Sequence, residues 1–318
     1  MSKRIVIMGE CMVELFQLVE NVYHQAFAGD VFNTAVYLKR CCEQPVEVQF
    51  FTAVGTDLIS DKLVRAVERE KIDTGLIFRT KTARPGLYMI NTDAFGERSF
   101  VYWRDTSAAK QVMQLAAAQN AYEQLAGADM FFFSGITLAI LNEQDREDLF
   151  ALVSRLKAAG SQIIFDPNYR PALWANAEAA RQAFVRAYQL ADVAMPGLDD
   201  HKVLFGAETT EQVVAQLADL GVGEIIVKNG KDGISGRYQG QDFSALAYPV
   251  KKVVDTTAAG DSFNGGYLAA RLGGIAPQHA VKFAARLAGF VVEHTGAIVA
   301  KDQFNGFWAK NRPSQFQK

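Results

Sequence analysis

The sequence predicts an α/β protein with a mainly parallel sheet covered on both faces by helices, and with a small second sheet. Short, continuously apolar segments alternate with amphipathic helical segments, which is the pattern of strands buried on both faces. Of the 318 residues 49% are hydrophobic and 21% are charged, so the chain can bury a sizeable core. Because no repeat, low-complexity tract or Pro-rich linker marks a boundary, we treat residues 1–318 as a single domain.

Six apolar segments of strand length follow one another along the chain, and helical patterns separate them. The predicted strands are 5–8, 48–53, 130–134, 162–166, 193–195 and 224–227. The clearest helical patterns are 60–70, 143–159, 177–190 and 211–220, the last followed by Gly221, which suits a helix end. After about residue 250 small residues dominate, and we expect helices over 260–271 and 277–294.

Two pairs of alternating segments interrupt this pattern and predict β-hairpins. Segments 86–91 and 98–104 flank Asp93-Ala94-Phe95-Gly96, which are favourable turn residues. Segments 13–19 and 22–27 are joined across Glu20-Asn21. Four such strands, from about 11–28 and 86–105, could form a small sheet that projects from the core.

Composition and charge exclude several classes of partner. The 33 Lys and Arg against 35 Asp and Glu give a net charge of −2, so the sequence predicts no nucleic-acid partner. The apolar segment 5–8 is too short for a signal sequence or a membrane span, and we expect no membrane partner. Three cysteines, an odd count without metal or disulfide spacing, favour a reducing compartment and therefore the cytoplasm.

Several common site motifs are missing from the sequence. The Gly230-Lys231 pair is followed by Asp232, so it does not end a P-loop, and no GxGxxG opens the first helix. The four histidines stand singly, with no HExxH pattern and no cysteine at ligand spacing. The sequence therefore disfavours a dinucleotide oxidoreductase and a zinc site.

The segment 253–266 carries the sharpest chemical signal. It is predicted to be a strand, a loop of small residues and then a helix, and a helix N-terminus offers free backbone N–H groups to an anion. Asp261, at the start of that helix, would stay ionised and could accept a proton from a hydroxyl group. The alternative is that Asp261 or Ser262 only caps the helix.

Residues 255–267, from Asp255-Thr256-Thr257-Ala258-Ala259-Gly260-Asp261 onward, resemble the C-terminal signature of the PfkB, or ribokinase-like, carbohydrate kinases. Residues 28–35, Ala-Gly-Asp-Val-Phe-Asn-Thr-Ala, resemble the N-terminal signature of that family. The resemblance extends over essentially the whole chain. It implies a ribokinase-like three-layer α/β/α core with a β-sheet lid.

Further segments are similar to the sugar-acid kinases of this family. They are 9–12, 85–88, 96–98, 102–104, 134–136 and 166–171. The resemblance implies ATP-dependent phosphorylation of 2-dehydro-3-deoxy-D-gluconate to its 6-phosphate. Two alternatives stay open: a neutral-sugar kinase of the same family, such as a fructokinase or ribokinase, and a non-catalytic regulator that binds a sugar acid.

The resemblance also implies roles for individual residues. Asp261 would be the catalytic base, and the backbone N–H groups of Ala258, Ala259, Gly260 and Asp261 would form an anion hole for the transferred phosphoryl group. Ala258 stands where the family more often has Gly. Residues 228–233 resemble the nucleotide-side loop, although alone they indicate only a β-turn. The ATP-binding set is Asn168, Lys228, Gly230, Gly233, Ala258 and Gly260.

Mg²⁺ is expected to arrive with ATP, because it bridges phosphate oxygens and needs few protein ligands. The family's Asn-x-x-Glu motif would fall near 197–200, with Asp200 at the acidic position and no Asn ahead of it. The alternative for Asp200 is a solvated carboxylate in a loop ahead of a helix that begins at His201.

A sugar-acid kinase needs cations for the substrate carboxylate. A guanidinium binds a carboxylate with two parallel hydrogen bonds, and a tyrosine can cover the carbon chain and add a hydrogen bond from its hydroxyl. From the resemblance, the substrate-binding set is Gly29, Asp30, Asn33, Tyr88, Tyr102, Arg104, Ile136, Arg170 and Asp261. Apart from the resemblance, the tyrosines and arginines could be ordinary hairpin or surface residues. We expect the apolar hairpin residues to close over substrate and to form a homo-oligomer contact.

Overall fold

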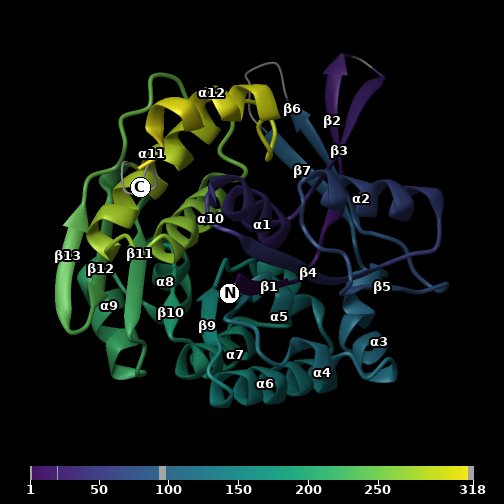
Figure 1. Ribbon diagram of the computed structural model, residues 1–318, viewed down its shortest axis with the longest axis horizontal. Coiled ribbons are helices and arrows are strands. Elements are labelled where there is room, and N and C mark those ends of the chain that lie inside the picture. Colours follow the sequence, from purple (N-terminus) through teal and green to yellow (C-terminus); the bar gives the residue numbers. More distant parts are fainter. Residues whose placement is uncertain (1, 20, 93–97, 314–318) are drawn as a thin grey trace.

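The computed structural model describes residues 2–19, 21–92 and 98–313, and within them the strands form two sheets (Figure 1). The large sheet has nine strands in the order β13-β12-β11-β10-β9-β8-β1-β4-β5. Its strands are β1 (Lys3–Met8), β4 (Val46–Val54), β5 (Ile77–Arg79), β8 (Met130–Ser134), β9 (Gln162–Asp166), β10 (Val193–Ala194), β11 (Glu224–Lys228), β12 (Ile234–Tyr238) and β13 (Gln241–Ala245).

Helices cover both faces of the large sheet (Figure 1). One face carries α1 (Asp30–Cys41), α2 (Leu58–Arg69), α10 (Ala259–Leu272), α11 (Pro277–Val292) and α12 (Lys301–Asn311). The other carries α3 (Val112–Ala118), α4 (Tyr122–Leu125), α5 (Gly135–Ile140), α6 (Glu143–Ala158), α7 (Ala177–Leu190), α8 (Leu198–Phe205) and α9 (Thr210–Asp219). Short 3₁₀ turns lie at Ala108–Gln111, Pro171–Leu173 and Gly230–Asp232.

The side chains of β1 show why the protein has three layers. Ile5 and Ile7 belong to the hydrophobic cluster that includes α1 and α10, whereas Val6 and Met8 belong to the cluster under α5, α6 and α7. All four are fully buried. Because successive residues of a strand point to opposite faces, one continuous apolar strand fills both cores. The predicted α/β/α layering is confirmed.

Most strands of the large sheet run parallel, as predicted. β1 pairs in parallel with β4 and β8, and the parallel pairing continues through β9 and β10 to β11. Only β12 and β13, which the sequence analysis missed, are antiparallel. The carboxyl ends of the parallel strands therefore share one edge, where α/β proteins commonly bind ligands.

One predicted strand is wrong. Residues 253 and 254 pair with no strand, and the N–H groups of Val254 and Asp255 both donate to the carbonyl of Val292 at the end of α11. Val253 is 62% exposed. The β-branched pair favours an extended backbone, but the chain passes the end of a helix there instead of lying beside another strand.

The second sheet has the order β3-β2-β6-β7 and is formed by the two predicted strand pairs. Its strands are β2 (Met12–Val19), β3 (Val22–Ala28), β6 (Leu87–Thr92) and β7 (Arg98–Trp103), and β2 joins the pairs by lying parallel to β6. This sheet, called the lid below, projects beside α2 in Figure 1. The predicted turn residues 93–96 and Glu20 lie outside the described residues.

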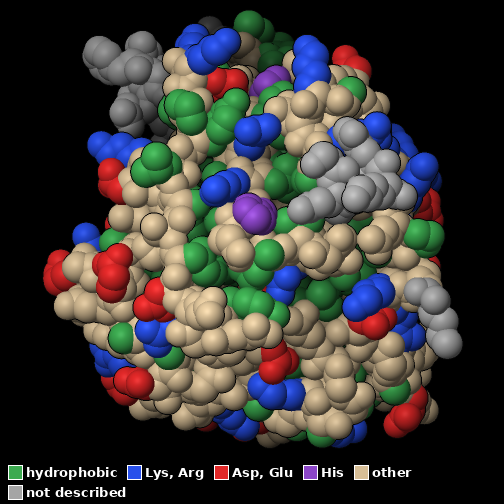
Figure 2. All heavy atoms as spheres, turned by 60° about the vertical axis from the view of Figure 1, so that its left-hand side comes forward, with side chains coloured by type: hydrophobic (Ala, Val, Ile, Leu, Met, Phe, Trp, Pro, Cys, Tyr) green, Lys and Arg blue, Asp and Glu red, His purple; other side chains and the backbone are tan. Residues whose placement is uncertain are grey.

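On the face shown in Figure 2, acidic and basic side chains are interspersed, and hydrophobic side chains gather near its centre. Among the described residues no helix is long and apolar enough to cross a membrane.

Candidate active site

The predicted catalytic aspartate lies where α1 meets α10. Asp261 is the third residue of α10 and is 8% exposed. The side-chain amide of Asn33 donates to Asp261 Oδ2 at 2.9 Å, and the Thr34 hydroxyl donates to the Asp261 carbonyl at 3.3 Å. Gly265 permits this close packing, since a Cβ there would lie 2.7 Å from the Thr34 carbonyl oxygen. Both family-like signatures therefore meet at one carboxylate.

Burial makes Asp261 an unusually weak acid. The pKa of Asp261 is raised to about 8, mainly because burial removes water and also because the Asp30 carboxylate lies nearby, while the hydrogen bond from Asn33 acts in the opposite direction. Burial also raises the pKa of Asp30, whose carboxylate accepts from Asn168 Nδ2 at 3.2 Å. A carboxylate with a pKa near the working pH can accept a proton from a hydroxyl and give it up again.

The beginning of α10 leaves backbone donors free. Its first residues have no intrahelical acceptors, and no side chain caps the helix. Of the four predicted anion-hole groups, the Ala259 N–H is already engaged by the Thr256 carbonyl at 3.2 Å. The backbone N–H groups of Ala258, Gly260 and Asp261 have no backbone acceptor among the described residues.

The capping alternative for Asp261 and Ser262 is wrong. The Asp261 carboxylate is bonded to Asn33 on α1, and the Ser262 hydroxyl donates to the carbonyl of Ala259. Neither side chain accepts from the backbone N–H groups that a cap would satisfy. These donors therefore remain available to an anion.

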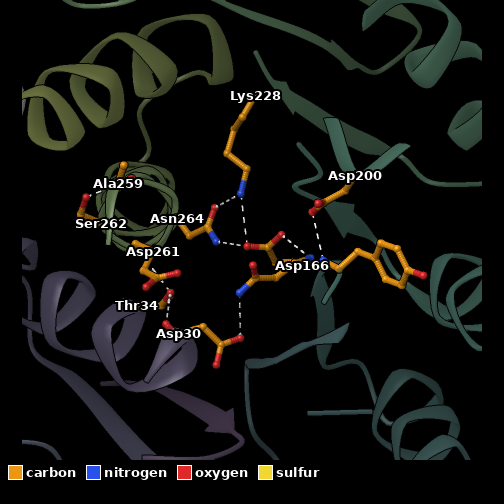
Figure 3. Close-up of polar contacts among 11 residues, drawn as sticks. Asp30, Thr34, Asp166, Asp200, Lys228, Ala259, Asp261, Ser262 and Asn264 are labelled. Atoms are coloured by element: carbon orange, nitrogen blue, oxygen red, sulfur yellow. Dashed lines mark hydrogen bonds and ion pairs between the residues drawn. The ribbon is translucent and has the colours of Figure 1, made fainter. Parts of the chain in front are cut away.

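Lys228, at the end of β11, points to the start of α10 (Figure 3). Its ammonium group donates to Asp166 Oδ2 at 3.2 Å and to Asn264 Oδ1 at 3.0 Å. The Asn264 amide completes the triangle by donating to Asp166 Oδ2 at 2.6 Å. A Cβ on Gly260 would lie 3.8 Å from the ammonium nitrogen, so this cation adjoins the predicted anion hole.

The alternative description of Asp200 as a solvated loop carboxylate is wrong. Asp200 lies within the first turn of α8 and not in a loop ahead of the helix, and it is not fully solvated. Its Oδ2 accepts the backbone N–H of Tyr169 at 3.0 Å (Figure 3), and burial raises the pKa of Asp200. Among the described residues no three His, Cys, Asp or Glu side chains form a group that could hold a metal ion.

A cavity of about 940 Å³ opens between the lid and the carboxyl edge of the large sheet. All nine predicted substrate residues line it, together with Asn168. Lys228, Gly230, Gly233, Asp200, Ala258, Ala259 and Gly260 lie outside its lining, so the structure separates the predicted nucleotide set, except Asn168, from the predicted substrate set.

The two predicted arginines have different surroundings in this cavity. Arg104, at the end of β7, forms an ion pair with Glu10, and its side chain is 10% exposed. Arg170 is exposed, and its guanidinium donates to the carbonyl of Tyr169 at 2.9 Å. The sequence analysis missed Glu10 as a site residue, although an acidic residue just after the first parallel strand is a recognisable signal.

The two predicted tyrosines also differ. Tyr88 is 5% exposed, and its hydroxyl already donates to the buried carboxylate of Glu14. Tyr102 is 49% exposed, with its ring centroid 5.7 Å from that of Tyr88. The hydroxyl hydrogen of Tyr88 is thus committed within the protein, while its ring still faces the cavity.

Comparisons with known proteins show which family the chain belongs to. Residues 2–303 match the family model of the pfkB family carbohydrate kinases. The chain is 40% identical to the 2-dehydro-3-deoxygluconokinase of Escherichia coli K12 over 306 residues, which cover 95% of this chain and 99% of that protein. It is 28% identical to the fructokinase of Vibrio alginolyticus, over 82% of this chain and 81% of that one.

The fold is also shared with solved structures. One from Escherichia coli, a complex with ATP and Mg²⁺, aligns with a TM-score of 0.81 at 24% identity and covers 93% of this chain and 94% of that one. This likeness shows the fold, whereas the family match spans nearly the whole chain. The chain therefore belongs to the pfkB family of carbohydrate kinases.

Proposed function

We propose that this carbohydrate kinase transfers the terminal phosphoryl group of ATP to the 6-hydroxyl of 2-dehydro-3-deoxy-D-gluconate. The observation that carries the proposal is the joint lining of one cavity by Asp261, Arg104 and Arg170. A buried base at one end and guanidinium groups elsewhere suit a substrate with a hydroxyl and a carboxylate. The 40% identity to a kinase named for this substrate supports the same choice.

In the proposed reaction Asp261 removes the proton of the 6-hydroxyl as the oxygen attacks the terminal phosphorus of ATP. The new O–P bond forms as the bond to the ADP oxygen breaks, and the proton stays on Asp261 until solvent takes it. The free N–H groups of Gly260 and Asp261 would stabilise the charge that develops on the phosphoryl oxygens. Asn33 would hold the Asp261 carboxylate in position for the proton.

The carboxylate of the sugar acid would bind Arg104 and Arg170. Charge-assisted hydrogen bonds in a partly dry cavity are strong, and a guanidinium fork matches a carboxylate. Gly29, Asp30 and Asn33, at the start of α1, would contact sugar hydroxyls. The rings of Tyr88 and Tyr102 would cover the carbon chain, and Ile136 would complete the wall.

ATP would lie near Lys228, with its terminal phosphate at the start of α10, where the nucleotide side adjoins the cavity. The turn at Gly230 and Gly233 and the amide of Asn168 would complete its site. Bound Mg²⁺ would neutralise phosphate charge, and it commonly keeps several waters and takes only one or two carboxylates from the protein. Asp200 is our candidate carboxylate, since it lies beside the Lys228 network.

We further propose that the lid pairs with a second copy of the chain. Its strands expose Leu18, Val19 and Trp103 by 57%, 63% and 55%, and apolar side chains on a small sheet favour association. A cytoplasmic location is proposed from the three free cysteines, two of them buried.

One assay tests the proposed function: release of ADP from MgATP across a panel of sugar acids and neutral ketoses. We expect the highest kcat/KM for 2-dehydro-3-deoxygluconate. Preference for fructose or ribose would instead favour the neutral-sugar alternative. Binding of the acid without ADP release would favour a non-catalytic regulator.

A further inference from the structure

Glu10 lies between β1 and β2, where the chain leaves the large sheet and enters the lid. Its side chain is 1% exposed. One carboxylate oxygen accepts the hydroxyl of Ser107, and the other accepts the guanidinium of Arg104. Gly86 leaves room for this carboxylate, since a Cβ there would lie 2.7 Å from Glu10 Oε1. The segment that directly follows the lid strand β7 and the segment that follows β1 are therefore tied together at one buried charge.

Arg104 still has donors to offer after this pairing. A guanidinium carries five N–H groups, and Glu10 accepts from one terminal nitrogen. Arg104 Nε is buried and has no acceptor among the described residues. Because an unpaired buried donor costs free energy, the geometry favours an acceptor supplied by a ligand in the cavity that Arg104 lines.

The charges around the cavity decide how the Glu10–Arg104 pair can affect the binding of an acidic substrate. Its described lining includes five acidic residues and only two basic ones, Arg104 and Arg170. Glu10 is one of those acids, so by itself its charge would repel a substrate carboxylate. It can favour an acidic substrate only by acting through Arg104.

We propose that Glu10 is a positioning residue that aims the Arg104 guanidinium at the carboxylate of the sugar acid and so couples acid binding to the lid. This inference rests on the proposed function for its choice of substrate. Glu10 holds the Arg104 side chain, which would otherwise be flexible, in one conformation. The conformational entropy of Arg104 is therefore lost when the protein folds and not when the substrate binds. Glu10 takes no part in the proton or phosphoryl transfer.

The proposal predicts that Glu10→Ala raises KM for the sugar acid when Arg104 is present but does not raise it when Arg104 is absent. In the wild-type background Glu10→Ala should raise KM for the sugar acid roughly 10-fold, with kcat within about 3-fold, because one charge-assisted contact loses its orientation. In an Arg104→Ala background Glu10→Ala should leave KM unchanged or lower it, since it then removes only a repulsive charge. A double-mutant cycle measures this reversal.

Glu224 provides a matched control. It is also a buried carboxylate that pairs with an arginine, Arg271, but it lies at the opposite end of β11 from Lys228. Glu224→Ala should lower the melting temperature without changing KM for the acid. If Glu10→Ala does not fold, Ser107→Ala replaces it, because this change loosens the Glu10 carboxylate and should raise KM only when Arg104 is present.

An equal rise in KM in both backgrounds, or no change in the wild-type background, would overturn the role of Glu10. Wild-type turnover of the sugar acid tests the proposed function separately. Should the enzyme prefer a neutral ketose, the proposed function fails, and the cycle is measured instead on the inhibition constant of the sugar acid against that ketose. The reversal of sign still decides the role of Glu10.

Discussion

Asn33 donates a hydrogen bond of 2.9 Å from its side-chain amide to Oδ2 of Asp261, across 228 positions of sequence. This bond joins the first turn of α1 to the first turn of α10. It stabilises the ionised carboxylate, while burial and the charge of Asp30 favour the protonated one. The balance of these effects sets the pH range in which Asp261 can act as a base.

Two substitutions should therefore move the pH profile in opposite directions. Asp30→Asn removes a charge that raises the pKa of Asp261, and Asn33→Ala removes a hydrogen bond that lowers it. Because the base must be ionised, kcat/KM of the wild type should rise with pH through a midpoint near the pKa of about 8. The midpoint should move to lower pH in Asp30→Asn and to higher pH in Asn33→Ala. Shifts in the same direction would contradict this account.

Asp261→Asn should abolish most turnover and leave MgATP binding nearly intact. Loss of a general base typically lowers kcat by ~10²–10⁴-fold. Single-turnover kinetics and calorimetric titration with MgATP measure the two effects separately. A variant that kept more than about a third of wild-type kcat under chemistry-limited conditions would place the base elsewhere.

The same substitution should stabilise the unliganded protein at alkaline pH. The folded pKa of Asp261 is about 8 against an ordinary 3.8, so between these values the native state binds more protons than the unfolded state. Stability from this group therefore falls as pH rises through that range. The melting temperature of Asp261→Asn should exceed that of the wild type by a margin that grows from pH 5 to pH 8. A margin independent of pH would refute the raised pKa.

Asn264→Ala should weaken nucleotide binding and spare the sugar. The change removes one of the two acceptors of the Lys228 ammonium and the donor to Asp166. We expect a rise in the Kd for MgATP of roughly 5–15-fold, the equivalent of about one lost hydrogen bond, with KM for the sugar acid unchanged. Asn142→Ala, which removes the cap of α6 and a hydrogen bond to Asp145, outside the described lining of the cavity, is the matched control. Equal effects on both ligands would mean that the triangle is only structural.

The lid should respond to substrate and carry the contact between copies. Strands with little core beneath them are easily opened, so sugar acid should slow hydrogen exchange in β6 and β7. Light scattering should detect a species larger than a monomer. Trp103→Lys, which places a charge on the exposed apolar face, should shift that species toward the monomer. If the wild-type protein is monomeric and the sugar acid does not change hydrogen exchange in β6 and β7, both the contact between copies and the response of the lid to substrate are disproved.

The sequence predicted the parallel core well because its strands are local patterns. Segments 130–134 and 162–166 coincide with β8 and β9, and the helix pattern 177–190 coincides with α7. The predicted strand at 253–254 failed because sheet membership depends on a neighbour that no local pattern reveals.

The predicted substrate residues line one cavity, but their contacts with one another were not predicted. Resemblance selected residues that do meet in one cavity, yet the pairing of Arg104 with Glu10 and of Tyr88 with Glu14 was not foreseen. These pairs join positions 94 and 74 residues apart; the first forms where the chain leaves β1, and the second forms between the lid strands β2 and β6. Long-range electrostatic partners of this kind leave no periodic signal in a sequence.

The central claim is that the cavity selects a substrate carboxylate. Arg170 tests this claim most directly because the residue is exposed, and among the described residues no carboxylate lies within ion-pair distance of its guanidinium. The measurement is kcat/KM for 2-dehydro-3-deoxygluconate and for a neutral ketose in wild type, Arg170→Ala and Arg170→Lys. We predict a loss of about 10–200-fold for the acid in Arg170→Ala, a much smaller loss for the ketose, and partial rescue by lysine, which restores the charge without the planar fork. Equal losses for the acid and the ketose would contradict the carboxylate site and favour a neutral-sugar kinase.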